Sequence, residues 1–313
     1  MNKAKYSIAD TFGVNVPKSA KVTGLDQSEE TNAGYFLESN YKFRKDLLRD
    51  VLAWWEFSSK GDGLFLTGPT GSGKSSLILQ IAARLNWPIY QVTAHEHMEF
   101  PDLLGRMVIN SDGSMSFQHG SLPKAYKYGG LFLLDEEDML PPGGSVGFNG
   151  VIQGEPLTIP ENGGEVIYPH PDFRFAATGN TSGNGDYGLY LGTSRQNIAF
   201  MDRFWTIEVD YMDAETEKAL LKACTSHDDD KIDKFIEVAN EVRKLHVQEE
   251  SDVEVPLSTR VLIRWAQIVQ FFYAVSSDNK SPLHYALDRA RLFSVEPKTR
   301  EAIHEIVQRV FGE

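Results

Sequence analysis

The segment GPTGSGKS at positions 68–75 constrains the fold of this 313-residue chain more than any other feature. It matches the pattern G-x-x-x-x-G-K-[ST] and lies between an apolar run at 63–67, which predicts a buried strand, and a helical pattern at 75–86. Glycines in such a loop let backbone N–H groups face phosphate oxygens, and the following helix adds the positive end of its dipole. The flanking strand and helix favour a phosphate-binding loop over a chance glycine-rich turn.

Each part of this loop has an expected role. The Lys74 ammonium is expected to reach the β- and γ-phosphates of a nucleotide, and the Ser75 hydroxyl is expected to bind Mg²⁺. The residues predicted to hold the nucleotide are Gly68, Pro69, Thr70, Gly71, Ser72, Gly73, Lys74, Ser75 and Ser76.

Short apolar segments alternate with helical patterns up to about residue 211. Such alternation is typical of a parallel sheet covered by helices on both faces, so the predicted fold class is α/β. Asp112-Gly113 and Asn162-Gly163 predict two hairpin insertions, at 106–119 and 156–169. The predicted strands are 63–67, 89–93, 130–138, 173–181 and 204–210, and the predicted helices are 41–58, 75–86 and 122–129.

This pattern divides the chain into three regions. Residues 1–40 have no sustained periodicity and predict an extended N-terminal arm. Residues 41–211 form the α/β core, and after about residue 212 all predicted elements are helices. Residues 212–313 are therefore expected to form a separate helical subdomain.

A second candidate site lies where the strand predicted at 130–138 ends in four carboxylates, Asp135 to Asp138. Ligands of open α/β sheets bind at the carboxyl ends of the strands. We expect Asp135 to hold Mg²⁺ through water, and Glu136, which points to the other face, to orient and activate the attacking water. A solvated acidic turn is the alternative, and the phosphate loop makes it the weaker one.

Asn180 and Arg203 are two further candidates. Asn180 ends the strand predicted at 173–181, where its side chain can hydrogen-bond the attacking water or the γ-phosphate; an ordinary turn residue is the alternative. Arg203 precedes the last predicted strand, and an arginine supplied in trans stabilises charge on a transferring phosphoryl group. A surface ion pair with Asp202 is the alternative, and Arg195 competes for the same role.

Arg260 is the last candidate. It follows Ser258, a predicted helix N-cap, so its cation opposes the helix dipole. A nucleotide phosphate nearby would account for that choice, and a solvated arginine is the alternative.

Composition limits the kinds of partner and the cellular compartment that we expect for this chain. Lys and Arg number 31 against 44 Asp and Glu, a net charge of −13, which disfavours nucleic acid and anionic membranes as partners. No apolar run approaches the ~18 residues of a membrane span, and the N-terminus lacks the apolar stretch of a secretory signal. Cys224 is the single cysteine and cannot form an internal disulfide, so the cytoplasm is the expected compartment.

The order of these motifs resembles that of the AAA+ ATPases. The two hairpins are similar to those of the branch with MoxR-type ATPases and magnesium chelatase motor subunits. Within that branch the strongest likeness is to the CobS-type ATPase subunit of aerobic cobaltochelatase. It rests on the segments 11–17, 82–88, 168–181, 185–197 and 257–267.

The resemblance implies roles for the candidate residues. Lys74 and Ser75 correspond to the Walker A pair, and Asp135 and Glu136 to the Walker B pair. The other three positions correspond to sensor 1, the arginine finger and sensor 2, which are Asn180, Arg203 and Arg260 respectively.

The resemblance also implies an activity and partners. The activity is Mg²⁺-dependent ATP hydrolysis by a ring, usually a hexamer, with ATP at subunit interfaces. The partners are a protein with a von Willebrand A domain and, for cobaltochelatase, a large porphyrin-binding subunit that receives the metal. A MoxR-type chaperone ATPase with another client is the alternative. A nucleotide-gated structural ring and a nucleic-acid motor are disfavoured, the first by the intact Glu136 and Asn180 and the second by the net charge.

Overall fold

The chain forms two compact units in a computed structural model. The first unit comprises Met1–Pro69 and Gly73–Val209, and the second comprises Thr70–Ser72 and Asp210–Glu313. The structure describes residues 2–28, 30–58, 62–141, 143–181, 196–248, 251–275 and 282–312, with only the backbone described at 274 and 275.

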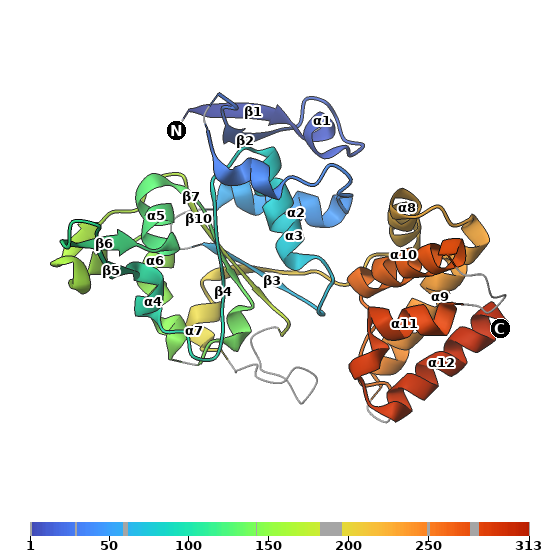
Figure 1. Ribbon diagram of the computed structural model, residues 1–313. Helices are drawn as coiled ribbons and strands as arrows, with labels where there is room; N and C mark the ends of the chain where they lie inside the picture. The colour runs from blue at the N-terminus through green and yellow to red at the C-terminus, as the bar shows by residue number, and fades with distance from the viewer. Residues whose placement is uncertain are drawn as a thin grey trace. The chain divides into compact units, whose positions relative to one another are not determined.

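A five-stranded parallel sheet forms the centre of the first unit (Figure 1). The strand order is β11-β3-β10-β7-β4, so the first strand of the sheet lies between two strands that come much later in the sequence. The parallel sheet expected from the alternating pattern is confirmed. Its strands are β3 (Gly63–Thr67), β4 (Ile89–Thr93), β7 (Gly130–Asp135), β10 (Phe173–Gly179) and β11 (Phe204–Glu208).

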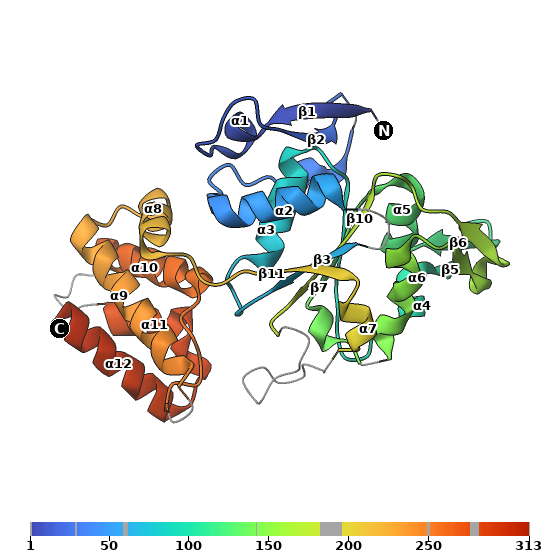
Figure 2. The same ribbon diagram turned by 180° about the vertical axis from the view of Figure 1, so that it is seen from behind.

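Helices cover both faces of this sheet. Successive side chains of a strand point to opposite faces. Accordingly, Leu64 and Leu66 of β3 pack in one apolar cluster with α2 and α3, whereas Phe65 packs in another with α5 and α6. Figure 2 shows these elements from behind. The helices that follow the N-terminal segment in the first unit, including three short ones that the sequence did not predict (α4, α6 and α7), are α2 (Lys45–Phe57), α3 (Lys74–Arg84), α4 (Phe100–Leu104), α5 (Ser121–Tyr128), α6 (Phe148–Gln153) and α7 (Ile198–Met201).

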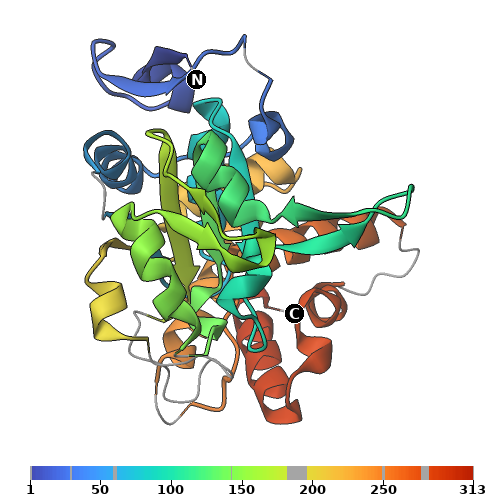
Figure 3. The same ribbon diagram turned by 90° about the vertical axis from the view of Figure 1, so that its left-hand side faces the viewer.

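Both predicted hairpins are present. β5 (Gly105–Ile109) pairs antiparallel with β6 (Met115–His119), and β8 (Leu157–Ile159) pairs antiparallel with β9 (Glu165–Ile167). Figure 3 shows the β5–β6 hairpin extending away from the sheet. The Glu165 carboxylate joins the hairpins, because His119 Nε2 lies 2.6 Å from Glu165 Oε2. This hydrogen bond and a second from Lys127 lower the pKa of Glu165 to about 2.

The expectation of an extended arm over residues 1–40 is wrong for much of that segment. It forms β1 (Lys3–Ser7), α1 (Ile8–Phe12) and β2 (Lys21–Leu25), with β1 and β2 antiparallel. Phe12 and Val22 are buried in the same cluster as the α2 side chains, and Trp55 Nε1 donates to the Thr23 carbonyl oxygen at 3.1 Å. These short elements mix polar and apolar residues without a continuous apolar run, and they are buried by contacts with α2 and its neighbours.

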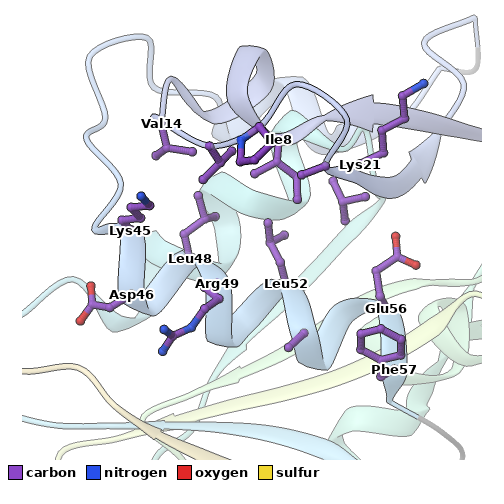
Figure 4. A pocket seen from close by; sticks show the side chains of 15 residues that line it. Ile8, Val14, Lys21, Lys45, Asp46, Leu48, Arg49, Leu52, Glu56 and Phe57 are labelled. Atoms are coloured by element: carbon purple, nitrogen blue, oxygen red, sulfur yellow. The ribbon is translucent and has the colours of Figure 1, made fainter.

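A cavity of about 720 Å³ remains between this N-terminal segment and α2 (Figure 4). Its lining is largely apolar and includes Ile8 and Val14 on one side and Leu48 and Leu52 of α2 on the other. Charged side chains of both segments complete the lining. No residue of the phosphate loop lines it, so the cavity is separate from the predicted nucleotide site.

The second unit is helical throughout its described elements. Asp228 caps α9 by accepting a hydrogen bond from the Lys231 N–H at 2.9 Å. In the core of the unit, Phe235 and Trp265 meet edge to face with ring centroids 4.6 Å apart. None of the helices in the described ranges has the length and apolar character to cross a membrane. The helices are α8 (Ala214–Cys224), α9 (Asp229–His246), α10 (Thr259–Val275), α11 (Leu283–Ala290) and α12 (Pro297–Phe311).

The acidic segment after β7 is partly buried. The strand predicted at 130–138 ends at Asp135, and a 3₁₀ turn, η2 (Glu137–Met139), follows. Glu137 and Asp138 are fully buried, so a solvated turn is the wrong description for these two acids. Burial, and then the charge of Asp138, raise the pKa of the Glu137 carboxyl to about 8. Glu137 is therefore mostly protonated at neutral pH.

We predict that this buried acid makes the stability of the first unit depend on pH. The pKa of Glu137 is higher in the folded chain than in the unfolded one, so its contribution is complete below about pH 4.5 and is lost as pH rises through about 8. Within that window each pH unit should lower the free energy of unfolding by up to ~1.4 kcal/mol. Glu137→Leu, which replaces the acid with an apolar side chain of similar size, should flatten this slope in urea denaturation between pH 5.5 and 8.5.

Glu136→Gln is the matched control, because the Glu136 side chain is exposed. This variant should keep the slope of the unmodified chain. An unchanged slope in Glu137→Leu would contradict the prediction.

Candidate active site

The phosphate loop follows the carboxyl end of β3, and its backbone requires glycine at two positions at least. Gly68 has φ of 140°, and a Cβ there would lie 2.3 Å from the Val209 carbonyl oxygen. Gly73 has φ of 96° and directly precedes α3. The loop therefore turns into a helix N-terminus, where backbone N–H groups lack intrahelical partners.

Lys74, the first residue of α3, is buried and lies among oxygen atoms. Its Nζ donates to the carbonyl oxygens of Gly68 at 2.8 Å and Pro69 at 3.0 Å, and to Asn180 Oδ1 at 2.9 Å. Asn180 comes directly after β10. The structure thus brings two of the predicted site residues into direct contact.

Ser75 and Asp135 also meet, as the sequence predicted for a shared metal site. Ser75 Oγ donates to Asp135 Oδ1 at 2.5 Å. The same carboxylate accepts from Thr178 Oγ1 at 2.5 Å and from Gln91 Nε2 at 3.2 Å. Sequence reasoning missed Thr178 and Gln91. The available signal was a polar residue inside an otherwise apolar strand adjacent to β7.

The donors at this point suit Mg²⁺. A hydroxyl and a carboxylate supply hard oxygen atoms, and Mg²⁺ is commonly held by one or two carboxylates together with substrate phosphates and water. Ser75 and Asp135 therefore fit the ion, and no larger group of protein ligands is required. Over the described ranges, no group of three or more His, Cys, Asp or Glu residues could hold a metal.

Glu136 lies at the same edge of the sheet. Its backbone is in the left-handed region, with φ of 57°, which is uncommon for a residue other than glycine. Its N–H donates to Thr178 Oγ1 at 3.1 Å, and its side chain is exposed. The carboxylate is thus available at the strand end, directly after Asp135.

Arg203 is not brought to the phosphate loop of its own chain. Its carbonyl oxygen accepts from the Gly63 N–H at 2.8 Å, so its backbone lies at the amino end of β3. The loop begins at the opposite end of this five-residue strand, roughly 16 Å away at about 3.3 Å per residue. Arg203 is half-buried, and its Nη1 donates to the Ala199 carbonyl oxygen.

The remaining candidates are placed less closely. Arg195 lies outside the described residues. Arg260 is exposed in the first turn of α10, and Ser258 Oγ accepts from the Val261 N–H at 3.3 Å, which confirms the predicted N-cap. Because Arg260 belongs to the second unit, its role toward a nucleotide stays a prediction.

Comparison with known proteins assigns both parts of the chain to families. Residues 63–204 match the AAA domain (dynein-related subfamily), and residues 217–310 match the CbbQ/NirQ/NorQ C-terminal domain. The aerobic cobaltochelatase subunit CobS of Sinorhizobium sp is 30% identical over 287 residues, which cover 88% of this chain and 82% of CobS. The denitrification regulatory protein NirQ of Pseudomonas aeruginosa is 28% identical over 244 residues, covering 78% of this chain and 88% of NirQ.

The fold agrees with these matches. A mutant of RuvB from Thermotoga maritima superposes with a TM-score of 0.50 at 15% identity, covering 80% of this chain and 71% of RuvB. The α/β class, the five-stranded parallel sheet and the C-terminal helical region predicted from the sequence are confirmed. The chain therefore belongs to the MoxR-like family of AAA+ P-loop ATPases that includes CobS and NirQ.

Proposed function

We propose that this protein is a Mg²⁺-dependent ATPase that works as a ring, most simply a hexamer, and uses ATP hydrolysis to remodel a partner. The observation that carries the proposal is the contact between Lys74 Nζ and Asn180 Oδ1, beside the contact between Ser75 and Asp135. Together these contacts supply a cation, an amide and two metal-ligating oxygens at the carboxyl edge of one parallel sheet.

In this proposal, Lys74 and the backbone N–H groups of the loop bind the β- and γ-phosphates of ATP. Ser75 and Asp135 hold Mg²⁺, which neutralises charge on the phosphate oxygens when bound. Glu136 accepts a proton from the attacking water, and the Asn180 amide orients that water. Binding is thus assigned to the loop, and water activation to the two strand ends.

Arg203 completes the site of a neighbouring subunit in our proposal. The length of β3 separates it from its own phosphate loop, so its guanidinium has to act on another copy of the chain. A cation there stabilises the charge that develops on the transferring phosphoryl group. Arg260, opening α10, is assigned to the nucleotide phosphates.

The proposed client is a metal-chelating enzyme, because the sequence match to CobS extends over most of this chain. In that case the partners are a von Willebrand A-domain protein and a large chelatase subunit, and cobalt is the cargo. A chaperone ATPase that acts with a von Willebrand A-domain protein on another client is the second candidate, favoured by the match to NirQ. We propose the cytoplasm as the compartment, since Cys224 is a free thiol.

The first prediction from this proposal separates ATP binding from ATP hydrolysis. Glu136→Gln should lower the ATP hydrolysis rate at least 100-fold, because it removes a general base, yet leave ATP affinity within about threefold. Lys74→Ala should weaken ATP binding itself, because it removes a phosphate contact. Phosphate release and titration with a fluorescent ATP analogue measure the two quantities. Glu161→Gln, an exposed glutamate in the β8–β9 turn, is the control. Equal loss of affinity in both site variants would refute these roles.

The second prediction concerns the shared site. Arg203→Ala should assemble and bind ATP but hydrolyse it about 10³- to 10⁵-fold more slowly, the range found for arginine fingers. Mixing it with Glu136→Gln should restore part of the activity, because some interfaces then pair an intact Arg203 with an intact Glu136. Arg49→Ala, which alters an exposed arginine of α2, should have no effect. Full turnover by a dilute monomer would exclude a shared site, and this behaviour in Arg195→Ala alone would transfer the role to Arg195.

The third prediction concerns the client. Tagged Glu136→Gln with ATP, used as bait in native host extract, should retain a von Willebrand A-domain protein and a large chelatase subunit. Lys74→Ala under the same conditions is the control and should retain neither. Recovery of the von Willebrand A-domain protein with another client would favour the chaperone function. Nuclease-sensitive retention of nucleic acid would favour a nucleic-acid motor, and an ATP-dependent ring that recruits neither would favour a structural role.

A further inference from the structure

Asp138 is a fully buried acid that has no role in the proposed hydrolysis of ATP. Its Oδ2 accepts hydrogen bonds from the Asn180 N–H at 2.7 Å, the Thr181 N–H at 3.1 Å and Thr181 Oγ1 at 3.4 Å. These donors all belong to the first two residues after β10. One carboxylate oxygen therefore fixes the turn that carries Asn180.

The turn is packed closely against Asp138. A Cβ at Gly179 would lie 3.3 Å from Asp138 Cγ and 2.7 Å from the Phe65 ring, so glycine lets the end of β10 approach the carboxylate. The contact continues to the phosphate loop, because Asn180 Oδ1 accepts from Lys74 Nζ at 2.9 Å. A line of hydrogen-bonded groups thus runs from the buried acid through Asn180 to the loop lysine.

The neighbouring Glu137 provides the contrast. It is as deeply buried as Asp138, but in the described part of the chain neither of its carboxylate oxygens has a hydrogen-bond partner. Burial raises the pKa of the Asp138 carboxyl, while the backbone N–H donors of Asn180 and Thr181 and the charge of Lys74 oppose that rise. Glu137 has no such donors among the described residues, and burial raises the pKa of its carboxyl to about 8.

We propose that Asp138 is a positioning residue of the nucleotide site: its carboxylate holds the turn after β10, so that the Asn180 amide lies where it can meet the loop lysine and the attacking water. This inference rests on the proposed ATPase function. Asp138 touches neither nucleotide nor water in this scheme and acts only through Asn180. A displacement of about 1 Å in such a group is enough to lower a rate about 100-fold.

The test compares Asp138→Leu and Asp138→Ala with Asp138→Asn. The first two remove every acceptor atom, whereas asparagine keeps one oxygen for the same two N–H groups. In the full-length chain, kcat for ATP hydrolysis should fall 10- to 100-fold in the first two variants, with KM within about threefold. Asp138→Asn should retain at least a third of the activity. Glu137→Leu is the matched control: it removes an adjacent, equally buried acid that has no side-chain hydrogen bond within the described residues, and it should keep kcat within about twofold.

Two readouts separate positioning from general damage to the fold. In an Asn180→Ala background, Asp138→Ala should change kcat less than twofold, because the residue through which Asp138 acts is already gone. Amide hydrogen exchange in a peptide that contains Asn180 and Thr181 should be faster in Asp138→Ala, while the α8–α12 helices keep their protection.

The following outcomes would overturn the proposal. They are an unchanged kcat in a folded Asp138→Ala or Asp138→Leu, a loss in Asp138→Asn as large as in Asp138→Ala, or a full further loss in the Asn180→Ala background. If Asp138→Leu does not fold, Asp138→Ala, which adds no bulk, decides. If the unmodified chain hydrolyses no ATP, the proposed function fails, and the exchange measurement still decides whether Asp138 holds the turn.

Discussion

The site depends on the hydrogen bonds between the buried Lys74 ammonium group and the oxygen atoms around it. Lys74 opens α3, whereas Asn180, whose Oδ1 it contacts, lies 106 positions later in the sequence. A buried cation is costly unless hydrogen-bonding oxygen atoms surround it, and the end of β10 supplies one such oxygen beside the two carbonyl oxygens of the loop. The register of β10 against β3 and β7 sets this contact, since a shift by one residue would turn Thr178 and its neighbours to the other face.

The acids at the same edge of the sheet differ in their hydrogen-bond partners and in their exposure. Asp135 accepts from a serine, a threonine and a glutamine, while Glu136 extends into solvent. Asp138 is stabilised by backbone N–H donors, and Glu137 is left without donors among the described residues. Four consecutive carboxyl groups thus have four different environments, and the one that is buried without a donor among the described residues, Glu137, has a pKa raised to about 8.

A parallel sheet has two different ends, and the residues of the proposed reaction are distributed between them. The loop, Asp135 and Asn180 gather at the carboxyl end, where ligands of open α/β sheets bind. Arg203 starts from the amino end of β3. If Arg203 acts on a phosphate, that phosphate belongs to another subunit, and assembly becomes a requirement for turnover. The geometry of a single strand is therefore the physical basis for proposing a ring.

The sequence by itself determined the five strands, the phosphate loop and the two hairpins, because buried strands, glycine turns and loop chemistry are local patterns. It also named Ser75 and Asp135 as residues of one Mg²⁺ site, although it did not predict the direct hydrogen bond between them. It did not predict that residues 3–25 fold onto α2, because these short elements mix polar and apolar residues without a continuous apolar run, and they gain their burial from contacts with a later helix. The contacts of Gln91, Thr178 and Asp138 were not predicted either, because a polar residue in or after an apolar strand does not show which group it meets. Only the tertiary structure decides which polar side chains of neighbouring strands face one another, because those contacts join residues that are far apart in the chain.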